Sequence, residues 1–193
     1  AYEANGHLQV YGADGAFSSH RVYVNGGAFY RHADDYKAGG GKELDFSQFQ
    51  KVNAFVNGGL RLAEHDMTEA TFIFDRATDV GYPALNMDVA KAEAFITSLS
   101  YKHLFQDNRL ESWETKVYYN HITHVMDDTK RPDVEIHMDM PGKSWTAGAY
   151  SLLTGSFGLH QAQLNIDGYY NRLFADMTMY PGGAAPMYMV TWP

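Results

Sequence analysis

Apolar and polar residues alternate with a period of two along most of the chain. The alternation is clearest in the segments 21–31, 51–62 and 161–171. Successive side chains of a β-strand point to opposite faces, so this period predicts strands with one apolar and one polar face. The apolar positions are Val22, Val24, Gly26, Ala28 and Tyr30, then Val52, Ala54, Val56, Gly58, Leu60 and Leu62, and finally Ala162, Leu164, Ile166 and Tyr170.

The same pattern, with turn residues between the segments, predicts eight strands. Their expected ranges are 7–12, 20–32, 48–62, 67–76, 92–103, 112–126, 145–153 and 159–173. Short connections are expected at 12–19, 63–66, 105–112 and 154–158, and long ones at 32–47, 76–89, 124–142 and after Arg172. Because short and long connections alternate, they lie at opposite ends of an up-and-down antiparallel sheet.

Two all-β architectures fit this pattern. A soluble antiparallel sheet with one face in a core also alternates. Three features favour an outer-membrane barrel: charged residues on the polar faces of long strands, the alternation of loop lengths, and aromatic residues near strand ends. These aromatic residues are Trp113, Tyr118, Tyr119, Tyr169 and Tyr170. We therefore predict an all-β fold, an antiparallel up-and-down transmembrane β-barrel, with a soluble β-sandwich binding module as the alternative.

The composition argues against several classes of function. The chain has 193 residues and a net charge of −8, and it lacks the basic stripe that nucleic-acid binding requires. It has no cysteine, which excludes disulfides and thiolate metal sites within the chain. No run approaches the roughly twenty apolar residues of a membrane helix. Since there is neither a nucleophile elbow nor an evident carboxylate pair, we expect no enzyme activity and no catalytic cofactor.

Methionines are concentrated at one end of the predicted strands. Of 9 methionines, only Met67 lies on the short-turn side, and the others lie in or beside the long loops. Thioether sulfur suits Cu(I), and imidazole suits copper in either oxidation state. The strand period places His124 and Met126 on the polar face together with Lys116 and Asn120. A His-x-Met pair on a strand can therefore offer a nitrogen and a sulfur to one copper ion.

Further His and Met residues form candidate secondary copper sites. They are His137, Met138 and Met140, then Met177 and Met179, then Met187 and Met189. The alternative is that each methionine is a flexible filler between packed loops and aromatic rings. The period places His121 on the face opposite His124, so we interpret His121 as structural or interfacial. Three aspartates are expected to attract cations to the mouth without ligating them; they are Asp127, Asp128 and Asp139.

Three other motifs lack the spacing of a functional site. HDMTE at 65–69 lacks the spacing of a zinc-binding HExxH helix, and GGGK at 39–42 lacks that of a phosphate-binding loop. The acidic segment ADDY at 33–36 lacks the DxDxDG arrangement of a calcium loop. We interpret the first two as a polar turn and a mobile loop, and we expect no Ca²⁺ site at the third.

Four separated segments resemble one protein family. They are DVGYPALNMDVAKA at 79–92, WETKVYYNHITHVMDD at 113–128, PDVEIHMDMPGKSWTAGAYS at 132–151 and YNRLFADMTMYPGGAAPMYMVTWP at 170–193. In this order they resemble TonB-dependent outer-membrane receptors of the copper-uptake type, over most of the chain from about Arg21 onward. The resemblance implies a 22-stranded barrel in the bacterial outer membrane, plugged by an N-terminal globular domain and energised through TonB.

The resemblance also implies a role for two residues. In that family an HxM pair at the barrel wall forms one half of a buried copper site, and His124 with Met126 matches this pattern. The other half comes from the plug, as a CxxxM-type motif in some members. The resemblance therefore implies that copper, as an ion or a chelate, is the transported ligand.

The chain departs from the family in extent, because it has about eight strands and lacks the plug, the TonB box and the remaining strands. We expect residues 1–193 to be part of a single transmembrane barrel domain of something longer, with a loop at 187–193. The expected partners are the TonB complex through the missing plug, copper, the lipid bilayer and lipopolysaccharide. An alternative cargo for the same barrel is a siderophore or another organic ligand.

Overall fold

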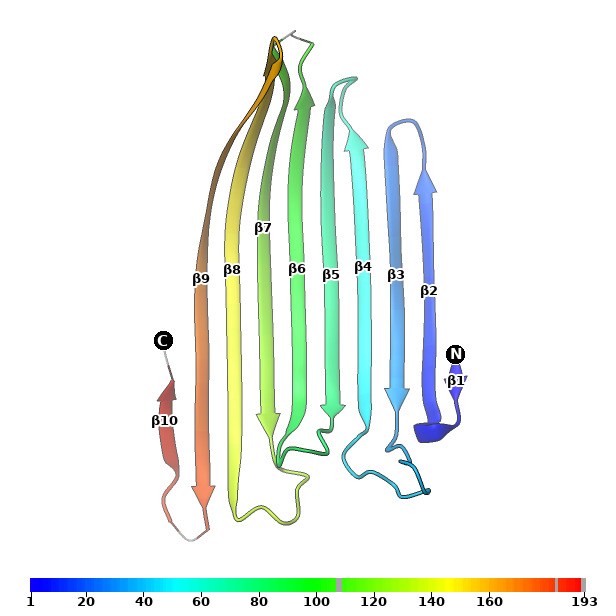
Figure 1. Ribbon diagram of the computed structural model, residues 1–193, viewed down its shortest axis with the longest axis vertical. Helices are drawn as coiled ribbons and strands as arrows, with labels where there is room; N and C mark the ends of the chain where they lie inside the picture. Colours follow the sequence, from blue (N-terminus) through cyan, green and yellow to red (C-terminus); the bar gives the residue numbers. More distant parts are fainter. Residues whose placement is uncertain (107–108, 183, 192–193) are drawn as a thin grey trace.

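A computed structural model describes residues 1–106, 109–182 and 184–191. Its strands form one antiparallel sheet in which each strand pairs with its neighbours in the sequence (Figure 1). The elements are β1 (Tyr2–Glu3), the short 3₁₀ helix η1 (Asn5–His7), β2 (Leu8–Ser18), β3 (Val22–Ala33), β4 (Phe49–Arg61), β5 (Asp66–Val80), β6 (Asp88–Leu104), β7 (Leu110–Asp127), β8 (Ile136–Phe157), β9 (His160–Pro181) and β10 (Met187–Thr191). The predicted all-β, antiparallel, up-and-down fold class is confirmed, as an open sheet of ten strands.

The described residues contain no helix that is long and apolar enough to cross a membrane.

The eight predicted strands correspond to β2–β9, and the errors lie at their ends. β2 continues to Ser18, so the turn expected at 12–19 is mostly strand. The long loop expected at 76–89 shortens to 81–87, between β5 and β6. In both places the amphipathic alternation fades, but the backbone continues to pair with the neighbouring strand. The alternation therefore marks only the half-apolar part of each strand.

The largest correction concerns the segments that carry methionine. The segment 124–142, expected to be a loop, is strand except at 128–135. β9 continues to Pro181, and the terminal loop expected at 187–193 is strand β10 over its described residues. The last two residues of that expected loop, and two residues of the turn expected at 105–112, lie outside the described residues. All of the candidate metal ligands therefore lie on strands, which fixes the face that each side chain occupies.

The strand register confirms the two predicted faces. One row of paired residues crosses seven strands and defines the apolar face: Val24, Gly58, Ala70, Leu99, Val117, Ala149 and Gly168. The adjacent row defines the polar face: Asn25, Asn57, Thr71, Ser98, Tyr118, Gly148 and Tyr169. The three apolar sets predicted from the sequence share the apolar face, except that Leu62 lies just beyond the end of β4.

Side chains of the polar face hydrogen-bond to one another across the strands. The Asn57 amide donates to the Asn25 side-chain oxygen at 3.0 Å, and the Tyr150 hydroxyl donates to Glu114 at 2.5 Å. Polar groups that are withdrawn from bulk water need such partners. This network is consistent with a face that lines an interior instead of one that contacts lipid.

Two aromatic pairs bound a band of the apolar face. Tyr101 and Trp113 have ring centroids 5.8 Å apart near the short-turn end, and Trp145 and Tyr170 have centroids 5.2 Å apart nearer the long loops. Trp113 pairs with Leu153, eight residues from Trp145, which spans about 26 Å along β8 at roughly 3.3 Å per residue. Strands of outer-membrane barrels tilt by about 35–45°, so this length along β8 corresponds to a height of roughly 20 Å, close to the band of about 25 Å that aromatic girdles flank in such barrels.

The expectation that aromatic residues mark strand ends needs correction. Only Trp113 lies near an end, because β8 and β9 extend well beyond Trp145 and Tyr170 on the long-loop side. Tyr118 and Tyr169 lie on the polar face and take no part in the aromatic pairs.

The sheet is a single layer with almost no core. Among the described residues, only Ala33 and Val89 are buried apolar side chains. Leu99, Val117 and Ile166 on the apolar face are 50%, 53% and 67% exposed. A β-sandwich would cover this face with a second sheet. The described residues form one sheet, so they do not by themselves form the alternative sandwich.

Candidate metal site

Seven methionines lie on the polar face at the long-loop ends of β7–β10. The register pairs Met126 with Met140, Met138 with Met179, Met179 with Met187, and Met177 with Met189. The constant register of β8 and β9 also places Met140 opposite Met177. Cβ atoms of directly opposed residues lie about 4.5–5.5 Å apart. We call these residues the methionine cluster: Met126, Met140, Met177 and Met189 in one row, and Met138, Met179 and Met187 in the next.

No second layer covers the methionine cluster among the described residues. Met187 and Met189 are 45% and 49% exposed, and the others are partly exposed or, like Met126, half-buried. Methionine that acts as a core filler occupies gaps between packed layers. Apart from the buried Val89, which pairs with Met126, the directly opposed residues of these side chains are other methionines, so their arrangement concentrates thioether sulfur on one surface.

His124 lies on the same face, one row nearer the short-turn end. Its direct neighbours in the row are Ala92 on β6 and Gly142 on β8, both small. In the described part of the chain no hydrogen bond or ion pair engages its exposed ring. Met126 is two residues away along β7, on the same face. The predicted pairing of an imidazole with a thioether is thus geometrically available, with room for the ring to turn toward the sulfur.

His137 does not join the methionine cluster. It pairs with Tyr180 on the face opposite Met138, and its ring Nδ1 lies 2.9 Å from a carboxylate oxygen of Asp128. Asp128 is 2% exposed, and its second oxygen accepts the Met138 backbone N–H at 2.9 Å. The Asp128 carboxylate therefore holds the beginning of β8, and with it the row that contains Met138.

The other two aspartates expected at the mouth lie elsewhere. Asp127 and Asp139 are directly opposed on β7 and β8, on the side of the sheet away from the methionines. A hydrogen bond with Asp139 raises the pKa of Tyr180. Of the sequence-predicted ligands, the structure thus brings His124 together with five methionines: Met126, Met138, Met140, Met177 and Met179. It places His137 on the opposite face of the sheet.

Met187 and Met189, which the sequence assigns to a secondary loop site, complete the cluster because they lie on a strand. A signal for this is present in the sequence. Three Met-x-Met pairs have the period of a strand, at 138–140, 177–179 and 187–189. Two residues of that spacing share a face, so three such pairs on adjacent strands give a shared surface.

Ion pairs tie the long loops together next to this site. Arg131 is buried against Asp88, with its Nε–H donating to the carboxylate at 3.0 Å, and its guanidinium carbon lies 3.7 Å from the centre of the Phe46 ring. Lys130 bonds to Asp79 and lowers the pKa of that carboxyl. A cavity of about 460 Å³ lies between the loops 34–48, 81–87 and 128–135, and its lining includes Phe46, Lys130 and Arg131.

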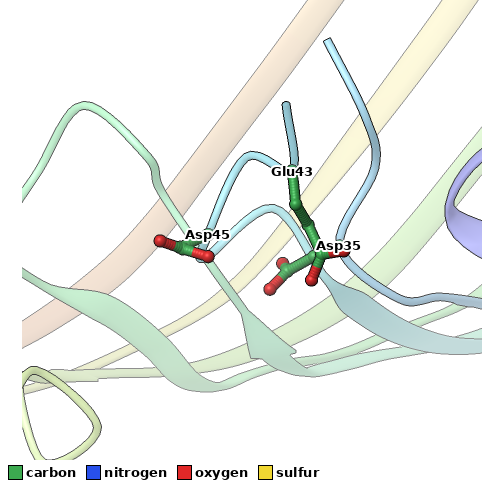
Figure 2. A group of neighbouring side chains, drawn as sticks. All are labelled: Asp35, Glu43 and Asp45. Carbon is green, nitrogen blue, oxygen red and sulfur yellow. The ribbon is translucent and has the colours of Figure 1, made fainter. Parts of the chain in front are cut away.

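Figure 2 shows an acidic group on the loop between β3 and β4. The carboxylates of Asp35, Glu43 and Asp45 each have an oxygen within 4.8 Å of the others. Asp35 already accepts the backbone N–H groups of Ser47 at 2.6 Å and Gln48 at 2.9 Å. Its contacts explain how this loop folds back on itself, and they leave Glu43 and Asp45 as exposed carboxylates.

Comparisons with known proteins give a structural likeness and no match by sequence. No family model matches the chain, and no curated protein matches it. Among solved structures, the copper transporter OprC superposes with a TM-score of 0.76 at 20% identity over 97% of this chain. The chain spans 32% of the length of OprC. The protein therefore shares its fold with about a third of a copper transporter.

Proposed function

We propose that this protein is part of a TonB-dependent receptor that transports copper across the bacterial outer membrane. The single observation that carries the proposal is the methionine cluster, with His124 beside it on the polar face. Soft thioether ligands select Cu(I) over the hard cations that prefer oxygen. The likeness to a copper transporter supports the same cargo.

The proposed path begins at the long-loop end of the sheet. Copper is captured by the exposed methionines of β10, Met187 and Met189, and moves between neighbouring thioethers toward β7. Thioethers are neutral ligands, so exchange between successive sites does not require the separation of strong ion pairs. His124 and Met126 then hold copper together with ligands from the plug, and TonB-driven movement of the plug releases it to the periplasm.

The apolar face supports the proposed membrane location. Its exposed aliphatic residues would be costly in water, but in lipid they need no covering layer. The polar face would then line the interior, where hydrogen bonds such as that between Asn57 and Asn25 satisfy the side chains. Capture at one end and release at the other follow naturally from an interior surface of this kind.

A second candidate is a receptor for an organic ligand such as a siderophore. The cavity of about 460 Å³ between the long loops favours it, since this volume is within the range of small-molecule sites. The two candidates differ in what the methionines do. Replacement of Met177 and Met179 by Leu removes soft ligands at similar volume. It should lower copper binding if the protein is a copper receptor, and it should leave binding of the organic ligand unchanged if the protein is a siderophore-type receptor.

Copper stoichiometry tests the proposed function. The intact protein, solubilised in detergent and loaded with Cu(I), should hold about one tightly bound copper ion, and His124→Ala/Met126→Ala should lose it. Met67→Leu, on the same face but at the short-turn end, is the matched control and should bind as the wild type does. Elemental analysis after desalting measures this. Wild-type protein without copper, or a double variant that retains it, would refute the proposal.

A further inference from the structure

The apolar face changes from aliphatic to cationic just beyond its aromatic boundary on the long-loop side. Arg172 lies in the same row as Trp145, and Lys143 lies in the next row toward the long loops, which also contains Arg76 and Glu93. Lys91 lies one step further along β6. We call these four cations the basic strip: Arg76, Lys91, Lys143 and Arg172. The chain as a whole carries a net charge of −8, so the strip runs against the overall charge.

The strip carries more positive charge than its neighbours neutralise. Glu93 is the carboxylate that serves two of the cations, with Lys91 at 3.2 Å and Arg76 at 3.8 Å. Lys143 and Arg172 are exposed and make no ion pair within the described residues. The four cations and one carboxylate leave an excess of three positive charges on this surface.

Lys143 and Arg172 are placed to contact one anion together. Lys143 pairs with Phe174, and Arg172 is two residues before Phe174 on β9, so the two cations are diagonal neighbours on one face. Cβ atoms in this relation lie about 7–8 Å apart, within reach of long side chains. An ammonium group and a guanidinium group that converge on one phosphate make charge-assisted hydrogen bonds to it.

Acidic residues limit the strip on its far side. Asp176 follows Phe174 by two residues on the same face, and Asp127 and Asp139 lie beyond it toward the loops. On the other side lie the aromatic pair of Trp145 and Tyr170 and the exposed aliphatic surface. The positive charge is thus confined to a narrow level directly above the apolar band, which is where the phosphates of membrane lipids lie relative to their acyl chains.

We propose that the basic strip binds the phosphate groups of a phosphorylated glycolipid of the outer leaflet, the lipid A part of lipopolysaccharide. The acyl chains of this glycolipid lie on the apolar face of the sheet, and its phosphates contact Lys143 and Arg172. The inference rests on the proposed membrane location. Continuity between the aliphatic band and the strip selects a lipid-borne phosphate, because a soluble anion gains nothing from the adjoining apolar surface.

Lipid titration of the intact protein in detergent tests the inference. Purified lipid A and its dephosphorylated form are compared by native mass spectrometry for the wild type and for Lys143→Gln/Arg172→Gln. We expect the wild type to prefer the phosphorylated form, and the double variant to lose about fivefold in affinity for each cation removed. The control is Lys102→Gln/Lys116→Gln, which removes the same charge from the polar face of β6 and β7.

The outcomes separate this inference from the proposed function. Equal binding of both lipid forms by the wild type overturns the inference, as does an equal loss in the control variant. Copper stoichiometry on the same samples reports on the transport proposal independently. Protein that holds copper but shows no phosphate preference refutes only the basic strip, whereas protein that extracts from cells without detergent refutes both.

Discussion

Arg131 is the residue on which the long connections depend. Its side chain is 7% exposed and that of its partner Asp88 is 5% exposed. It also donates to the Tyr82 carbonyl at 3.0 Å. A buried ion pair adds little net stability compared with an apolar pair, but removal of one partner leaves a buried charge uncompensated. The loss of folding stability on substitution at this site therefore depends on whether one charge or both are removed.

Arg131→Met is expected to destabilise the protein by about 3 kcal/mol, because Asp88 remains buried without its cation. Arg131→Met/Asp88→Leu should recover most of this loss, since no charge remains buried. Equilibrium urea unfolding of the intact protein in detergent micelles measures both values. A single variant as stable as the wild type, or a double variant no better than the single one, would show that the pair does not organise the loops.

Asp79 makes part of the loop contacts sensitive to acid. Its bond to Lys130 lowers its pKa below the ordinary value of 3.8. A carboxyl with a lowered folded-state pKa stabilises the fold above its unfolded value, and this contribution disappears as the pH falls through the folded value. Protection of the 81–87 loop against hydrogen exchange should therefore fall in acid below 3.8 for the wild type, and less for Asp79→Asn.

Asp45→Asn is the control for this effect, because Asp45 is an exposed acid of the neighbouring loop. It should keep the acid response of the wild type. An identical acid response in Asp79→Asn would mean that the bond to Lys130 does not hold the loop.

The strands show how much of the fold can be predicted from the sequence alone. The alternation locates β2–β9 because the period of two is strong wherever one face is apolar. It misses outer parts of the strands such as 88–91 of β6, where Lys91 places a charge on the otherwise apolar face. Pairing there follows from backbone hydrogen bonds to a neighbouring strand, which a local pattern does not reveal.

The same dependence on strand boundaries and register explains which parts of the candidate site the sequence predicts correctly. His124 and Met126 can be assigned to one face from the sequence because the predicted strand runs through residue 126, as β7 does. The sequence groups His137 with Met138 because both fall in an expected loop, where no face is defined. Since β8 begins at Ile136, the period separates them. Contacts between methionines of different strands depend on register, which is set by the pairing between strands and not by the period within one strand.

A charge on the apolar face tests the assignment of faces on a single strand. Val117→Arg places a cation in the middle of the proposed lipid-facing band and should lower the free energy of unfolding by about 2–4 kcal/mol. Asn120→Arg, on the polar face of the same strand, should cost far less because an interior surface can hydrate the guanidinium. Unfolding in lipid vesicles compares the two variants. Equal costs would mean that the two faces do not meet different solvents.

The whole sheet is open, and its edges and its uncovered face bear on the proposed setting. β1 and β10 are its edges, and an unpaired edge and an uncovered apolar face are both liabilities in water. A barrel in a membrane removes both, since further strands pair with the edges and lipid covers the face. The coverage of 97% of this chain but 32% of OprC agrees with a sheet that forms one part of such a barrel.

The most direct test of a copper site built on methionine is X-ray absorption at the copper edge of the intact, Cu(I)-loaded protein. We expect sulfur scatterers around copper. Their contribution should fall in Met126→Leu/Met140→Leu, which removes a cross-strand pair of the cluster, and remain unchanged in Met67→Leu. Copper surrounded only by nitrogen and oxygen, or a double variant with the spectrum of the wild type, would contradict a copper site built on the methionine cluster.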